Sequence, residues 1–312
     1  MKLKKIIASL SIMTMLFAFV GCSNAMDLSI NLKKGDKYNL HELIEQKGNI
    51  NVQGQNIDLN QVMDMNFAME VKDVDKDKNV TMDYKYDSIK VSAESDGAKN
   101  EYDSKKPDSA NPMSALYGSV IGKGFTVKIS NKGQVLEVKG TDELLNSIVD
   151  KISASAEEKN QIKNSLAQSF GDEAIKSMIN QSMNYYPKNQ VKNNDTWESK
   201  YDIKTMMPMS ISNKLKFLGE KDGLLNVDVQ STVDVDTKNK PINFMSIKTN
   251  MKLNGNCKGT VNINKETGLV AKADLTENMN GTMEMLSTNA SAQNMKMPMK
   301  MTAKIIYETT KK

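Results

Sequence analysis

The sequence of 312 residues contains no arginine, a single histidine and only two cysteines. Every one of its 42 basic residues is therefore lysine. The planar guanidinium of arginine is the group that proteins favour for bidentate contacts with phosphate and with guanine. Its absence argues against recognition of nucleic acids, and we expect no nucleic-acid partner.

The motifs of common catalytic sites are also missing. The sequence has no HExxH, GxSxG or CxxC pattern, and residues 118–124 are one residue short of a phosphate-binding loop. His41 has no cysteine near it and no metal-ligand spacing. Residues 73–84 begin like a calcium-binding loop, but Lys78 stands where that loop needs glycine, so we expect a hairpin turn there. We predict that the protein is not an enzyme and carries no cofactor.

Residues 1–21 have the composition of a bacterial signal peptide. Three lysines precede an apolar run over residues 6–20, which is too short for a membrane-spanning helix. The run ends in Phe19-Val20-Gly21-Cys22, which resembles the lipobox of bacterial lipoproteins. The resemblance implies cleavage before Cys22, lipid such as palmitate on its thiol, and one mature domain over residues 22–312, anchored to the cell membrane outside the cytoplasm. The alternative is an ordinary secretory signal with a chance cysteine.

A lipid on Cys22 would leave Cys257 without a cysteine partner, so we expect no disulfide. The domain must then be held together by its core, for which its length is sufficient. Acidic and basic residues nearly balance once the signal peptide is removed, which gives the domain no electrostatic attraction to anionic lipid.

Most of the mature chain alternates apolar and polar residues with a period of two, the pattern of half-buried strands. Residues 63–71, 245–263 and 295–305 show it most clearly. The phase slips at Ser88-Ile89, which predicts a β-bulge, and the polar residues 94–112 predict a long loop. We predict an α+β fold with a large curved antiparallel sheet or an open β-barrel.

Residues 141–186 form the only stretch with a continuous helical period. Ser155-Ala-Glu-Glu158 is a capping box that would start one helix, and Gly171 would end it. We expect these helices to lie between two β halves of the chain and to pack on the concave face of the sheet.

Small residues and methionines suggest a ligand site. Gly255, Cys257 and Gly259 lie on one face of a strand and predict a trough there. The chain has 23 methionines, whose flexible side chains suit core filling first and a pliable wall around an apolar ligand second. The predicted ligand-binding residues are Gly255, Cys257, Gly259, Met279, Met283, Met297, Met299 and Met301. Glu277 is the only acid on its apolar face, and we expect a bulge to turn it outward, with a polar group at a cavity mouth as the alternative.

Binding of Cu(I) is a third interpretation, because thioethers are soft ligands. Residues 295, 297, 299 and 301 are methionines on one strand face, but alternate residues are ~6.6–6.8 Å apart. A metal would therefore need them to lean together or to recruit Met283 or Met285.

Residues 170–173, Pro187 and the turn Asn193-Asn194-Asp195-Thr196-Trp197 resemble a family of uncharacterised bacterial lipoproteins. Those proteins combine a lipobox, a β meander, a helical middle and a Gly-Asp-x-Trp turn. Asn194 replaces the glycine here, which fits a left-handed position that asparagine tolerates. The family implies no activity. The layout is also similar to lipoprotein carrier and localisation proteins of the cell envelope, which hold acyl chains between sheet and helices.

We therefore predict a membrane-anchored lipoprotein that binds a hydrophobic small molecule or lipid between sheet and helices. The alternative is a non-enzymatic structural or interaction protein of the cell envelope, in which the helices simply fill the sheet.

Overall fold

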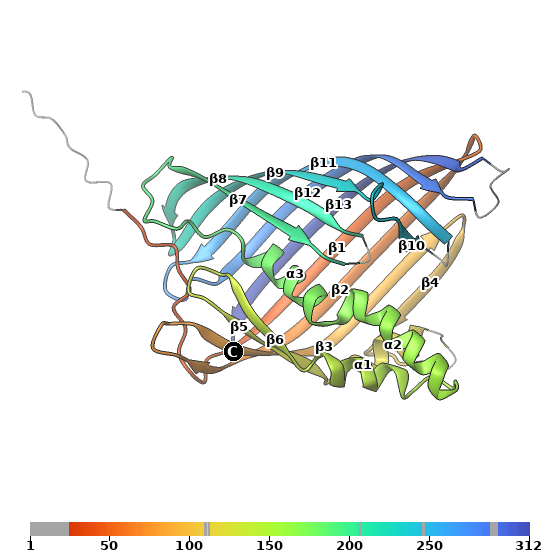
Figure 1. Ribbon diagram of the computed structural model, residues 1–312. Coiled ribbons are helices and arrows are strands. Elements are labelled where there is room, and N and C mark those ends of the chain that lie inside the picture. The colour runs from red at the N-terminus through yellow and green to blue at the C-terminus, as the bar shows by residue number, and fades with distance from the viewer. Residues whose placement is uncertain (1–24, 109–110, 112, 206, 245–246, 288–292) are drawn as a thin grey trace, which may run out of the picture.

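The computed structural model describes residues 25–108, 111, 113–205, 207–244, 247–287 and 293–312 (Figure 1). The predicted signal peptide and lipid attachment at Cys22 lie outside these residues. Thirteen strands make up most of the described chain. They are β1 (Lys37–Val52), β2 (Gln55–Val74), β3 (Val80–Ser95), β4 (Ala98–Asp103), β5 (Gly124–Ile129), β6 (Val135–Lys139), β7 (Thr196–Ile203), β8 (Met209–Lys221), β9 (Leu224–Asp236), β10 (Ile242–Phe244), β11 (Ile247–Asn264), β12 (Val270–Met285) and β13 (Met295–Lys311).

All strands belong to one antiparallel sheet in the order β6-β5-β3-β2-β1-β13-β12-β11-β9-β8-β7, with β4 beside β3 and β10 beside β11. The pairing of β1 with β13 joins the two β halves of the chain. In the described part of the chain β6 and β7 end this order and do not pair with each other, so the sheet curves without closing (Figure 1). The prediction of a large antiparallel sheet is confirmed.

Three α-helices occupy the predicted helical stretch: α1 (Thr141–Val149), α2 (Ala156–Phe170) and α3 (Asp172–Met183). The capping box is present at α2, where the backbone N–H of Ser155 donates to the Glu158 carboxylate at 2.8 Å. A separate π-helical turn, η1 (Ser114–Gly118), comes before β5. No helix among the residues that the structure describes is long and apolar enough to cross a membrane.

The chief contacts of the helices with the sheet are at its edge strands. α3 contacts both β6 and β7, and α1 contacts β5. The Asn180 side chain of α3 accepts a hydrogen bond from the N–H of Val135 in β6, and the Ser199 hydroxyl of β7 donates to the carbonyl of Asn184 just after α3, both at 3.1 Å. The twelve residues of α3 span only ~18 Å, which is too short to cover so wide a sheet. Of the three helices, α3 therefore joins the two edges of the sheet.

Three local predictions meet the structure well. Asn66 pairs with Ser88 while Phe67 pairs with Tyr86, so an extra residue forms a bulge next to the predicted phase slip. Asn194 has a φ of 72°, the left-handed conformation expected at that turn. The calcium-like segment is a hairpin turn, in which the Asp75 carboxylate accepts hydrogen bonds from the N–H groups of Asp77 and Asn79.

The predicted long loop over residues 94–112 is wrong in its first half. β3 continues to Ser95, and β4 returns beside it through a tight turn at Asp96 and Gly97, whose φ angles are 48° and 76°. Asp-Gly is a favoured two-residue hairpin turn because both positions need positive φ. The polar composition hid the strand because β4 lies at an exposed edge.

An N-terminal segment without regular structure closes one end of the curved sheet. Leu28 and Ile30 are buried there, and the N–H of Ile30 donates to Asn131 at 2.8 Å. Gly268 packs against this segment so closely that a Cβ atom on Gly268 would come within 1.8 Å of the Ser29 carbonyl oxygen. The Gly268 carbonyl oxygen accepts a hydrogen bond of 2.6 Å from the Tyr186 hydroxyl. The start of the described chain is thus fixed to the turn between β11 and β12.

Candidate functional site on the inner face of the sheet

The inner face of the sheet is the face whose side chains form its two buried apolar clusters. On strands β3, β5, β9 and β11 most inner side chains are buried. On the central strands β1, β2 and β13 many inner side chains stay half-buried, because no helix lies against them closely. Those half-buried apolar residues are Leu40, Ile44, Ile57, Leu59, Met63, Met65, Met301 and Ala303. Apolar side chains that stay partly uncovered on one face can offer a binding surface to an apolar ligand.

A row of polar and small residues crosses the inner face from one edge of the sheet to the other, and we call it the polar row. The register places one member on each of ten strands: Ser199, Asn213, Ser231, Cys257, Glu277, Ala303, Gln46, Gln61, Ala93 and Asn100. It separates the larger apolar cluster, which includes side chains of α1 and α3, from a second cluster rich in methionine.

Hydrogen bonds connect one end of the polar row. The Ser231 hydroxyl donates to Asn213 at 2.7 Å, and the Asn213 amide donates to the Ser199 hydroxyl at 3.2 Å. Burial raises the pKa of Glu277, and burial together with the Glu277 carboxylate raises the pKa of Cys257 to about 12. A buried thiol with so high a pKa is unreactive, so Cys257 contributes size and polarity rather than nucleophilic chemistry.

Glu277 faces inward, contrary to the expected bulge. It pairs with Cys257 on one side and with Ala303 on the other, and neither register shifts at that point. It lines a small cavity of about 20 Å³ together with Tyr185, Tyr201 and others. That space is enough for one water molecule but not for an organic ligand.

A larger pocket of about 280 Å³ lies on the inner face where the polar row crosses the central strands. Gly48, Leu59 and Met301 supply apolar or small surface, and Gln46 and Gln61 supply two carboxamides that are register partners. The volume is close to the lower end of the ~300–1,000 Å³ typical of small-molecule sites, and mostly apolar walls with a few polar groups are their usual composition. This pocket is our candidate site.

Five of the eight predicted ligand-binding residues lie in this pocket or in the methionine cluster. Met301 lines the pocket, and its sulfur lies 3.9 Å from the Gln46 amide nitrogen. Met279, Met283, Met297 and Met299 are buried in the methionine cluster, each no more than 6% exposed. That cluster contains ten methionines among the residues described, with Ile203, Ile211, Val233, Val235 and Leu253 among its other members.

The trough predicted at Gly255, Cys257 and Gly259 is not open. A Cβ atom on Gly255 would come within 2.5 Å of the Asn278 carbonyl oxygen, and one on Gly259 within 2.0 Å of the Asp274 carbonyl oxygen. The neighbouring strand β12 therefore fills the space. These glycines let β11 and β12 approach closely as the sheet curves, which is a common reason for glycine in a strand.

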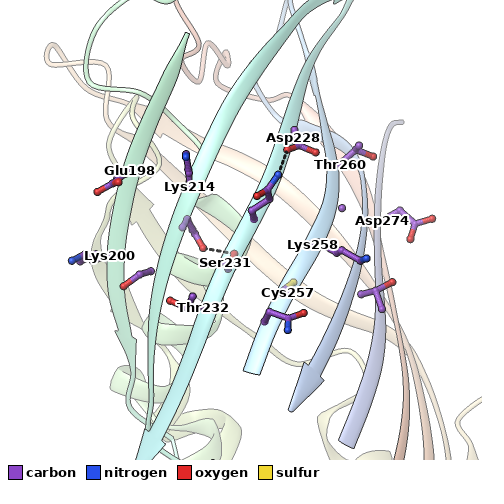
Figure 2. A pocket seen from close by; sticks show the side chains of 16 residues that line it. Glu198, Lys200, Lys214, Asp228, Ser231, Thr232, Cys257, Lys258, Thr260 and Asp274 are labelled. Carbon is purple, nitrogen blue, oxygen red and sulfur yellow. Dashed lines mark hydrogen bonds between the residues drawn. The ribbon is translucent and has the colours of Figure 1, made fainter. Parts of the chain in front are cut away.

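The outer face carries a wide polar hollow of about 1030 Å³ over strands β7, β8, β9, β11 and β12 (Figure 2). Its charged side chains are balanced, with Lys200, Lys214 and Lys258 against Glu198, Asp228 and Asp274. It has no aromatic side chain. Balanced charge gives it no preference for an ion of either sign.

Sequence reasoning missed Gln46, Gly48, Leu59 and Gln61. The signal was present, because Gln46 and Gln61 are polar residues at positions where the period of two calls for apolar ones. The alternation in β1 is irregular, however, so its inward phase could be assigned only from the pairing with β2 and β13.

These features define a class of protein: an open, curved antiparallel sheet whose inner face carries a partly uncovered apolar surface. The chain belongs to DUF6263, a family of unknown function that matches residues 77–270. No curated protein is significantly similar to the sequence.

Two solved structures are similar to this chain at a low level. Lipovitellin, in a structure titled for its lipid–protein interactions, matches 90% of this chain at 10% identity with a TM-score of 0.46, and this chain spans about a quarter of it, 26%. An outer membrane channel from Pseudomonas putida F1 matches 90% of this chain and 97% of its own at 7% identity, with a TM-score of 0.23. At these TM-scores neither likeness defines the fold or function of this chain.

Proposed function

We propose that this protein is an extracytoplasmic lipoprotein, anchored to the cell membrane through Cys22, that binds a hydrophobic small molecule or lipid on the inner face of its sheet. The observation that carries the proposal is the half-buried apolar strip on β1, β2 and β13, which leads to the 280 Å³ pocket. α3 joins the two edges of the sheet and leaves this strip of side chains facing the space between sheet and helices.

The pocket indicates the chemistry of the ligand. Gln46 and Gln61 can each donate and accept hydrogen bonds without carrying charge, and no charged side chain on the inner face lines the pocket with them. An apolar chain would lie along Leu40, Ile44 and Met63, with a neutral polar group such as an ester or amide at the two glutamines. A free carboxylate would have no cation to pair with there.

The anchor fits the position of the N-terminal segment. Residue 25, where the described chain begins, lies three residues beyond Cys22, and Met26 already pairs with Val191. In Figure 1 this segment enters at the left, and β12 ends at the opposite side of the molecule. A lipid on Cys22 would therefore hold the end of the sheet at the β11–β12 turn near the membrane.

Filling the pocket tests ligand binding. A Cβ atom on Gly48 would meet its neighbours at 3.5 Å or more, which is ordinary contact, so Gly48→Phe should fold while its ring occupies the pocket. Lys47→Phe places the same ring on the outer face and is the matched control. Using the full chain with Cys22→Ala, we expect G48F to weaken binding of a pyrene-labelled fatty acid methyl ester at least tenfold and K47F to leave it unchanged.

The alternative, a structural or interaction protein of the envelope, makes the opposite prediction. It expects no ligand in native mass spectra of the Cys22→Ala chain extracted from membranes, and equal probe binding by G48F and K47F. Either result would end the ligand proposal, while lipid on the wild-type chain tests the anchor separately.

A further inference from the structure

Methionines meet across strands at the end of the sheet where β12 leads into β13. The register pairs Met285 with Met295 and Met283 with Met297. The next two inner rows pair Gly281 with Met299 and Met279 with Met301. Two adjacent rows therefore place four thioethers at the corners of a rectangle, which we call the methionine rectangle: Met283, Met285, Met295 and Met297.

The rectangle is small enough for its sulfurs to meet. Register partners have Cβ atoms ~4.5–5.5 Å apart, and alternate residues on a strand are ~6.6–6.8 Å apart. Each corner then lies ~4 Å from the centre of the rectangle. The methionine side chain is unbranched and flexible, and a metal–sulfur bond adds a length comparable to the ~2.3 Å of zinc–thiolate bonds. Three or four sulfurs can reach a single ion above the centre, which one strand alone could not provide.

Burial and surroundings favour one class of ion. Met283 and Met297 are 3% and 2% exposed, while Met285 and Met295 are half-buried, so one side of the rectangle is shielded and the other is open to an entering ion. Neighbouring inner positions on β11 are Thr249 and Met251. Among the residues that the structure describes, no group of three or more His, Cys, Asp or Glu side chains could hold a metal. Neutral thioethers without carboxylates or imidazoles select soft monovalent ions.

We propose that the methionine rectangle binds one Cu(I) ion, or its analogue Ag(I), through thioether sulfurs alone. This site is separate from the lipid pocket, because none of its four residues lines that pocket. It goes beyond ligand binding, and each proposal can fail without the other.

Replacement of the four methionines by leucine tests the site, because leucine keeps the apolar volume and removes the sulfur. The matched control changes Met63, Met65, Met69 and Met82, which also lie on the inner face but have no methionine as a register partner. The full chain with Cys22→Ala serves as parent, so that the thiol of Cys22 is absent and buried Cys257 is common to all variants. Cu(I) is supplied as its bicinchoninate complex, whose colour reports transfer.

We expect the parent to take up one Cu(I) per chain, the rectangle variant to lose at least tenfold in affinity, and the control variant to stay within threefold. Equal affinity of parent and rectangle variant, equal loss in both variants, or no transfer to the parent would overturn the proposal. If the variant with all four methionines replaced does not fold, the double variant Met285→Leu/Met295→Leu, at the half-buried side, should still bind Cu(I) several-fold more weakly than the parent. X-ray absorption of the loaded parent should show sulfur ligands only, and nitrogen or oxygen neighbours would also overturn it.

Discussion

One acidic side chain on the inner face, that of Glu42, is buried. Glu42 lies in β1 opposite Tyr307 of β13, whose hydroxyl donates to it. Burial raises the pKa of Glu42 to about 7, and the hydrogen bond from Tyr307 only partly offsets this. Glu42 therefore binds its proton more tightly in the folded chain than in the unfolded chain.

The raised pKa of Glu42 makes the stability of the fold depend on pH. Below pH 4 the group is protonated in both states, whereas between about pH 4.5 and 7 the unfolded chain loses the proton first, so stability falls as pH rises. A shift of this size corresponds to about 3 kcal/mol. We expect Glu42→Gln to remove that loss, so that its urea midpoint changes less between pH 5 and pH 8 than that of the wild type. Glu45→Gln, at an exposed position of the same strand, should keep the wild-type slope; an unchanged slope in E42Q would contradict the assignment.

At the scale of elements, the three helices differ in how firmly they are held. α1 and α3 bury five residues each, among them Ile148 and Ile175. No side chain described in α2 is buried, and its chief contacts are with α1 and α3. α2 is thus a surface helix held by its neighbours and by its own capping box.

Local unfolding should begin in α2, because elements with few buried apolar contacts open at low free energy. We expect amide hydrogens of residues 160–170 to exchange faster than those of α3 and of the central strands. Ser155→Ala should cost about 1 kcal/mol of local stability by removing the cap and accelerate exchange in α2 severalfold. Ser165→Ala, at an exposed position inside α2, is the control and should change the exchange rates little.

At the scale of the molecule, stability depends on joining two β halves that are far apart in sequence. β1 pairs with β13 along nearly their full lengths, which connects the first half to the last strand. α3 makes the second connection, from β6 to β7, across the open side of the sheet. Ile175, which is fully buried, lies in the core cluster shared by both halves.

Ile175→Ala should therefore weaken the whole fold rather than one half. We expect a loss of about 2–5 kcal/mol, seen as one lowered thermal transition by circular dichroism. Lys176→Ala on the same helix should change the midpoint little, because its side chain is not buried. Two separate transitions in I175A would show that the halves fold independently.

The sequence by itself determined most of the strands, the helical block and its capping box, because alternation, helical period and turn chemistry are local properties. It also indicated an unusual number of inward methionines. Only the tertiary structure decided which residues meet. The trough at Gly255 and Gly259 is filled by β12, Glu277 turns inward, and Gln46 and Gln61 become neighbours, because these outcomes depend on register between strands distant in sequence. Register and curvature arise from the packing of the whole sheet, so no stretch of sequence specifies them alone.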